Sequence, residues 1–132
     1  MQTMREQVDE VAERILMGAL ELMAGGERWT TRALARDPRG LEISPTSPIA
    51  TRWCLAGAVR RSVMEVGLRD EVDGRLLQLA DAIACGILGQ ACFDLHGMTV
   101  GAVNDEFGWE AVQLAMKQAL AELQEGVVEA EG

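Results

Sequence analysis

The chain has 132 residues, of which 48% are hydrophobic and 25% are charged, as in a single globular domain and unlike a disordered chain. The net charge of −9 disfavours direct nucleic-acid binding, because phosphates would meet a repelling field. The three cysteines, an odd number, argue against a disulfide framework. The chain has no basic, apolar leader and no apolar run approaching about 18 residues, so we expect a cytoplasmic protein without membrane contact.

The charge is unevenly distributed along the chain. Residues 1–27 carry −4, residues 28–75 carry +3 and residues 76–132 carry −8. Such acidity is commonly a solubility feature, and it also suits contact with a basic partner or mimicry of nucleic acid.

The first predicted helix begins with Thr3 and Glu6, which have the spacing of a capping box. Apolar residues then alternate in steps of four and three as far as Leu22, and Gly25-Gly26 ends the helix. Three further apolar residues widen this stripe and suggest a homodimer contact as one alternative: Leu16, Leu20 and Met23.

Residues 32–36 and 41–44 alternate on both sides of Asp37-Pro38-Arg39-Gly40, which has the residues that a type I turn prefers. We expect a short β-hairpin there. Ser47 and Pro48 then favour the start of a second helix that includes Trp53 to Val59 and ends near Gly67. The small residues Ala56-Gly57-Ala58 predict close approach of neighbouring helices.

A third helix is expected from Asp70–Asp73 to about Cys92, and a fourth after a cap at Asn104 or Asp105. The predicted inner face of the third helix comprises Leu76, Leu79, Ala80, Ile83, Ile87 and Ala91. That of the fourth comprises Trp109, Val112, Ala115, Met116, Ala119 and Leu123. The predicted fold is mainly α: one domain over residues 1–132, a compact four-helix bundle with the β-hairpin inserted between helices 1 and 2. We expect residues 1–2 and 126–132 to fray.

Three motifs within residues 29–120 resemble those of a family of small bacterial and phage-associated proteins that is known only as a domain of unknown function. They are Ala35-Arg36-Asp37 with Gly40, Trp53-Cys54-Leu55-x-Gly57-Ala58, and Asn104-Asp105 before the last helix. The family's pattern has an aromatic residue before Asn-Asp, where this chain has Val103. The resemblance implies the helical fold and a phage or mobile-element setting, and it implies no activity.

Several residues are candidates for chemistry. Cys54 would be a nucleophile if activated, or a small buried thiol. Asp37 and Asp105 would complete an enzymatic or ligand-binding pocket with it, although turn formation and helix capping also explain them. Asn104, Asp105, Glu106 and Glu110 also offer oxygens for a cation or a general base.

A zinc site is a further alternative, because Cys85, Cys92 and His96 fall on one helical face and Cys54 would complete a Cys3His set. No CxxC pair supports it. No phosphate loop, dinucleotide fingerprint or other cofactor motif is present, so we expect no cofactor.

Arginines gather in the middle of the chain and, with Trp53, are the candidate binding residues: Arg36, Arg39, Arg52, Arg60 and Arg61, with Arg28 and Arg32 nearby. They would form a face for an acidic ligand or pair with acids of the terminal helices. With one histidine and no complete catalytic set, the leading hypothesis is a non-enzymatic, acidic protein-binding module. A specific version is an anti-CRISPR-like inhibitor that presents acidic helices to a nucleic-acid-binding enzyme.

Overall fold

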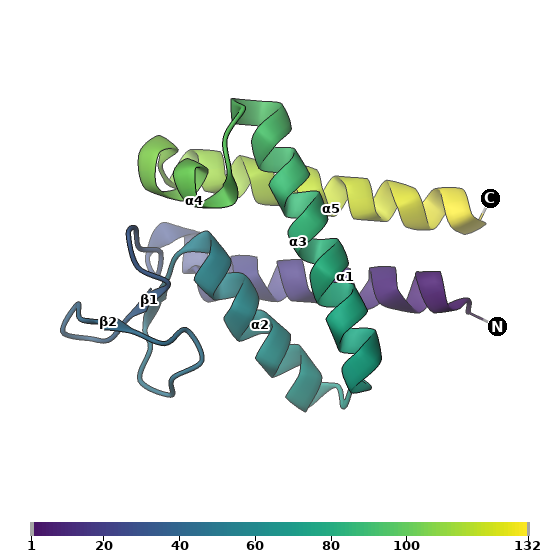
Figure 1. The fold of residues 1–132 in the computed structure, drawn as a ribbon, viewed down its shortest axis with the longest axis horizontal. Coiled ribbons are helices and arrows are strands. Elements are labelled where there is room, and N and C mark those ends of the chain that lie inside the picture. The colour runs from purple at the N-terminus through teal and green to yellow at the C-terminus, as the bar shows by residue number, and fades with distance from the viewer. Residues whose placement is uncertain (1, 132) are drawn as a thin grey trace.

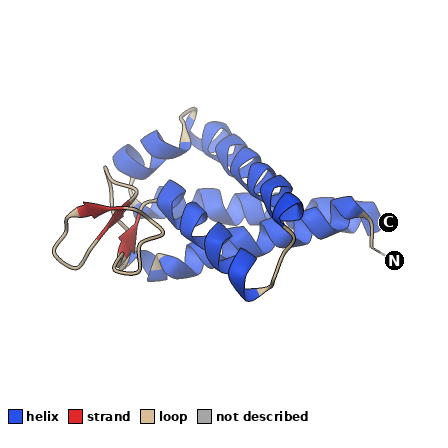
Figure 2. Ribbon diagram, turned by 60° about the horizontal axis from the view of Figure 1, so that its bottom comes forward, coloured by secondary structure: helices blue, strands red, loops and turns tan. Residues whose placement is uncertain are grey.

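The computed structural model describes residues 2–131, and the side chains of residues 2–125 within that range. Four long helices form most of it: α1 (Met4–Leu22), α2 (Leu55–Arg69), α3 (Gly74–His96) and α5 (Trp109–Glu131). Helices α1 and α5 lie side by side and antiparallel, so that both termini lie at one end (Figure 1). Helices α2 and α3 form a second layer across them. A small sheet lies at the end opposite the termini (Figure 2).

The predicted start of α1 and most of its predicted inner face are confirmed. The Thr3 hydroxyl accepts a hydrogen bond from the backbone N–H of Glu6 at 3.1 Å, as an N-cap does. Val8, Val11, Ile15 and Ala19 are buried, whereas Met4 is 59% exposed. Two of the residues that suggested a dimer contact, Leu16 and Met23, are fully buried in the core of this one chain, so that reason for expecting a homodimer is wrong.

The predicted hairpin is part of a three-stranded antiparallel sheet with the order β2-β1-β3. Strands β1 (Ala35–Arg36) and β2 (Glu42–Ile43) form the hairpin around the predicted turn. Strand β3 (Arg52–Trp53) pairs with the other edge of β1, Ala35 facing Trp53. The sequence placed this third strand inside the second helix, which was wrong.

Helix α2 begins at Leu55, with Cys54 rather than Ser47 as its N-cap. Gly57 is close to a loop and not, as expected, to a neighbouring helix: a Cβ there would lie 1.8 Å from the carbonyl oxygen of Leu34. The close helix contact lies elsewhere, between α1 and α2, where the buried Ser62 hydroxyl donates to the Ile15 carbonyl at 2.7 Å. A Cβ on Gly18 would lie 2.5 Å from that hydroxyl oxygen. Helix α2 is therefore held near its start, at Gly57, and at its middle, where Ser62 meets Gly18 of α1, by contacts that leave no room for a side chain on either glycine.

Helix α3 begins after Asp73, whose carboxylate caps the backbone N–H groups of Arg75 and Leu76. Two residues of its predicted inner face, Ala80 and Ala91, are confirmed as buried, and the rest of the buried stripe comprises Ala84, Leu88 and Cys92. Leu79 and Ile83, expected in the core, are about two-fifths exposed at 40% and 39%.

One window of α3 is apolar and long enough to span a membrane by composition, with mean hydropathy 1.5 and 28% of it buried. The window is not an unbroken apolar run, since Gln78, Asp81 and Gln90 interrupt α3. Core helices of soluble proteins meet the same criterion, and α3 packs on α1 and α5.

A short connection joins α3 to α5: α4 (Val100–Ala102) and then a π-helical turn (Val103–Phe107). Asn104 and Asp105 lie in this turn and do not cap the last helix, which begins at Trp109. The inner face of α5 is as predicted: Val112, Ala115, Met116, Ala119 and Leu123 are buried. The predicted mainly helical fold class is thus confirmed. The predicted two-stranded hairpin is part of a three-stranded sheet. The expected fraying of residues 126–132 stays a prediction, because residue 132 and the side chains of residues 126–131 lie outside the described part of the chain.

Candidate functional site

Two of the three motifs, Trp53-Cys54-Leu55 and Asn104-Asp105, meet around one buried side chain, that of Asn104, which is 2% exposed. Its Oδ1 accepts hydrogen bonds from the indole Nε1 of Trp29 at 2.7 Å and from the backbone N–H of Leu55 at 2.9 Å. Its Nδ2 donates to the carbonyl oxygen of Thr30 at 3.1 Å and to Asp105 Oδ1 at 3.0 Å. One amide therefore ties the loop after α1 and the start of α2 to the π-helical turn.

Asp105 extends this network to the same loop. Its Oδ1 also accepts the backbone N–H of Arg32 at 2.9 Å. Arg32 has a positive φ of 62°, in the left-handed region that L residues seldom adopt. The hydrogen bonds from the Arg32 backbone and from Asn104 hold the pKa of Asp105 below its ordinary value of 3.8. A carboxylate that stays ionised and holds a loop in this way is a poor general base at neutral pH.

Cys54 lies next to this network but is not activated as a nucleophile. Its Sγ accepts the backbone N–H of Gly57 at 3.3 Å, as the cap of α2. Burial raises the pKa of the Cys54 thiol, and the nearby Asp105 charge raises it further, against the lowering effect of the Gly57 N–H. A reactive cysteine needs the opposite shift, because the thiolate is the nucleophile.

Arg36 and Asp37 are used within the hairpin. The Arg36 guanidinium donates to the Thr30 hydroxyl, the Thr31 carbonyl and the Gly40 carbonyl, at 2.9 to 3.1 Å. Asp37 Oδ1 accepts the backbone N–H groups of Arg39 and Leu41. No hydrogen bond within the described residues joins Asp37 to Cys54 or Asp105, whereas Cys54 lies near the Asp105 carboxylate.

Trp53 and Arg61 hold the connector that leads to α2. The indole Nε1 of Trp53 donates to the Pro45 carbonyl at 3.0 Å, and Arg61 donates to the Pro45 and Ser47 carbonyls. The Arg61 guanidinium also lies over the Trp53 ring, 5.5 Å from its centroid. Both candidate binding residues are therefore occupied by contacts within the chain.

The remaining candidate arginines, Arg39, Arg52 and Arg60, are exposed. The ion pairs among side chains of residues 2–125 are Arg14–Asp70, Arg61–Glu65 and Arg69–Asp70. None joins a mid-chain arginine to an acid of α5 or of the first half of α1. The expected pairing with the terminal helices is thus wrong for these residues, and the arginines that are engaged bind mainly backbone oxygens.

The suggested zinc ligands do not converge. Cys85 is exposed, whereas Cys92 and Cys54 are buried. Although Cys85 is exposed as a residue, partial desolvation of its thiol and the neighbouring Asp81 raise its pKa to about 11. His96 stacks on Phe107 with ring centroids 4.7 Å apart. Among the described residues, no three cysteine, histidine or acidic side chains are grouped so as to hold a metal ion.

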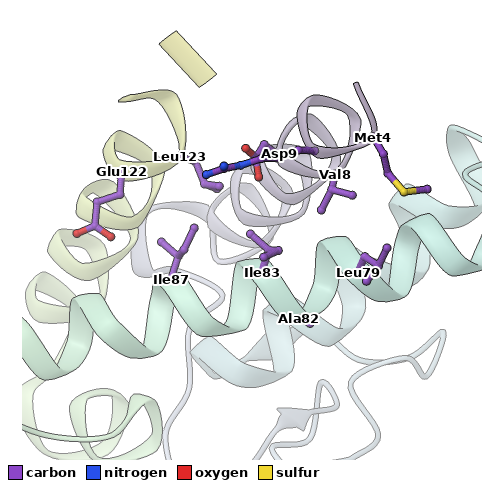
Figure 3. A pocket seen from close by; sticks show the side chains of 10 residues that line it. Met4, Val8, Asp9, Leu79, Ala82, Ile83, Ile87, Glu122 and Leu123 are labelled. Atoms are coloured by element: carbon purple, nitrogen blue, oxygen red, sulfur yellow. The ribbon is translucent and has the colours of Figure 1, made fainter. Parts of the chain in front are cut away.

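The sequence did not predict a groove between α1, α3 and α5, near the end with both termini (Figure 3). Its volume is about 620 Å³. Apolar side chains form most of its wall: Met4, Val8, Leu79, Ala82, Ile83, Ile87 and Leu123. Asp9, Glu122 and Arg5 complete the lining. The sequence feature that could have indicated this groove is that α3 is apolar around most of its circumference. Such a helix leaves some apolar residues outside the core.

Asp37, Cys54 and Asp105 line neither the groove nor two further cavities beside α3, as far as the described residues go. The motif residues therefore form a structural junction, while the largest of these three cavities lies at the other end of α1. No protein-family model, curated protein or solved structure matches the chain.

Proposed function

We propose that the protein is a non-enzymatic binding module that contacts a basic protein partner through the acidic residues of α1 and α5. The observation that carries this proposal is a cluster that we call the acidic end: Glu6, Asp9, Glu10, Glu13, Glu122 and Glu125. The antiparallel arrangement of α1 and α5 brings these residues to the end with both termini (Figure 1). Gln124 of α5 donates to Glu13 of α1 at 3.1 Å, which joins the two helices there.

None of these six acids belongs to an ion pair among the side chains of residues 2–125. Unpaired charges of one sign create a field that attracts a partner of opposite charge and raises the association rate. The engagement of Cys54, Asp105 and Asp37 in structural hydrogen bonds also supports a role other than catalysis.

The more specific version is an anti-CRISPR-like inhibitor in the cytoplasm of a bacterium that carries a phage or mobile element. In that version the acidic end occupies the nucleic-acid site of a basic enzyme. The motif resemblance is the reason for this setting, and the unpaired acids are the reason for the mode of binding.

The test immobilises three forms of the chain, namely the unmodified protein and two variants, and passes an extract of the native host over each. The proteins that each form retains are then compared. In one variant Glu6, Asp9, Glu122 and Glu125 are changed to their amides. A matched control changes four exposed acids near the sheet end instead: Glu21, Glu27, Glu106 and Glu110. We expect the unmodified chain and the control to retain a basic protein that added double-stranded DNA displaces, and the first variant to lose it. Equal retention by both variants would contradict the proposal.

A further inference from the structure

We infer that the groove between α1, α3 and α5 binds a basic, amphipathic helix of the partner. This inference rests on the proposed function and names the chemistry of the segment that is recognised. The first observation is the apolar wall. Leu79, Ile83 and Ile87 follow one another along α3 and point toward α1 and α5 (Figure 3).

The dimensions of the groove suit a helix. Leu79 and Ile87 are eight positions apart in α3, which is about 12 Å at about 1.5 Å per residue. Apolar side chains at positions i, i+3 or i+4, and i+7 of a partner helix cover a similar length, which is the usual pattern of a helix bound in a groove.

Some side chains that line the groove are buried, and others are partly exposed to solvent. Val8 and Leu123 are 7% and 3% exposed, and they close the bottom of the groove. Met4, Leu79 and Ile83 are between 39% and 59% exposed, so their apolar surface is available to a partner. Burying such surface supplies affinity in proportion to the area removed from water.

The carboxylates at the edge of the groove favour a partner segment with positive charge. Asp9 from α1 and Glu122 from α5 lie at the edge of the groove, and Arg5 is the one cation that lines it. Neither carboxylate belongs to an ion pair among the side chains of residues 2–125. Lysines or arginines flanking an apolar stripe would meet these carboxylates. A second copy of this chain or an anionic membrane would instead bring like charge to the same edge.

The experiment uses the full chain and a synthetic helical peptide of leucine and lysine, with leucine on one face. A scrambled peptide of the same composition, without an apolar face, is the matched control. Affinity is measured by isothermal titration calorimetry at low and high salt. We expect the patterned peptide to bind at least about tenfold more tightly than the scrambled one, and its affinity to fall as salt is raised.

Two pairs of substitutions locate the site. Leu79→Gln with Ile83→Gln changes the wall, and Asp9→Asn with Glu122→Gln changes the edge. The matched controls are Leu68→Gln with Leu114→Gln and Glu21→Gln with Glu110→Gln, which alter exposed residues outside the groove. We expect each groove pair to weaken binding about tenfold and each control pair to leave it within about twofold. Thermal unfolding of each variant checks that it is folded.

Equal binding of the two peptides, equal effects of groove and control pairs, or no binding would overturn the inference. Self-association, or binding to phosphatidylcholine vesicles, that only the wall pair abolishes would also overturn it and assign the face to a second copy or to lipid. In each case the proposed function would still be tested separately by retention of the basic host protein, which depends on the acidic end as a whole.

Discussion

Asn104 shows how much of the architecture depends on one side chain. Its four hydrogen bonds join residues 29–30, the first residue of α2 and the π-helical turn, which are far apart in the sequence. The amide is suited to this position because it offers one acceptor and two donors without a charge. A buried network of this kind stabilises a structure when every member is paired, and becomes costly when one is lost.

The substitution Asn104→Ala should lower the free energy of unfolding by about 3 kcal/mol, because the Trp29 indole and the Leu55 N–H would be buried without an acceptor. Urea unfolding monitored by circular dichroism measures the change. Gln90→Ala is the control, since Gln90 bonds only to Asp94 on the surface, and it should cost about 0.5 kcal/mol or less. Similar effects of the two substitutions would show that Asn104 is not a central contact.

Ionisation of the Asp105 carboxyl makes the free energy of unfolding depend on pH. Its pKa is lower in the folded state than its ordinary value of 3.8, so the folded carboxylate holds its proton less readily than the unfolded one. The stabilisation it provides is therefore fully present at neutral pH and is lost as the pH falls below about 3.8. We expect Asp105→Asn to be less stable than the unmodified chain at pH 7, and the difference to shrink on acidification through this range. Urea unfolding at a series of pH values measures it, and a difference that does not vary with pH would contradict this role.

At the scale of elements, the beginning of α2 is fixed by its contact with the loop before β1. The Leu34 carbonyl accepts the backbone N–H of Cys54 at 3.1 Å and lies against Gly57. Any side chain at Gly57 would displace that carbonyl, and with it the edge where β1 pairs with β3. The loop, the sheet and the helix therefore form one unit.

Two glycine substitutions should have opposite effects on stability. Gly57→Ala places a Cβ 1.8 Å from the Leu34 oxygen and should destabilise the protein by about 3 kcal/mol or more. Gly86→Ala, in the middle of α3, meets no atom within 4 Å and should stabilise it by about 1 kcal/mol through helix propensity. Chemical denaturation of both variants measures these changes. A Gly57→Ala variant as stable as the parent would show that the loop does not rest on α2.

The elements that the sequence predicts well are those with local signals. Periodic apolar residues and the Thr3 cap indicate α1, the inner residues of α5 are correct, and the Asp37 to Gly40 turn indicates the hairpin. Strand β3 could not be predicted in this way, because it exists only through pairing with β1, which is distant in the sequence. Asn104 has the same local appearance as a helix cap, and its actual bonds are to residues about 50 and 75 positions away.

Helix α3 was misread for a different reason. It is apolar on so many sides that periodicity does not identify which stripe is buried, and packing on α1 and α5 selects the small residues Ala80, Ala84 and Ala91. The larger Leu79 and Ile83 remain outside and line the groove. This site therefore depends on the arrangement of three helices, and no short motif encodes it.

At the scale of the whole molecule, the two ends have different characters. The end with the sheet contains the three sequence motifs, and their polar groups are largely engaged in hydrogen bonds with neighbouring loop and strand residues. The end with the termini combines the groove with the acidic end. We expect binding to occur at the second end, with the first serving to hold α1, α2 and α5 in place.

Hydrogen–deuterium exchange of the full chain, with and without the leucine–lysine peptide, tests this division most directly, because it reports on every segment at once. The account predicts slower exchange on peptide binding in residues 4–13 of α1, 79–87 of α3 and 118–125 of α5. It predicts no change in residues 28–54. Protection centred on residues 28–54, or spread evenly over the chain, would contradict the assignment of partner binding to the groove and the acidic end.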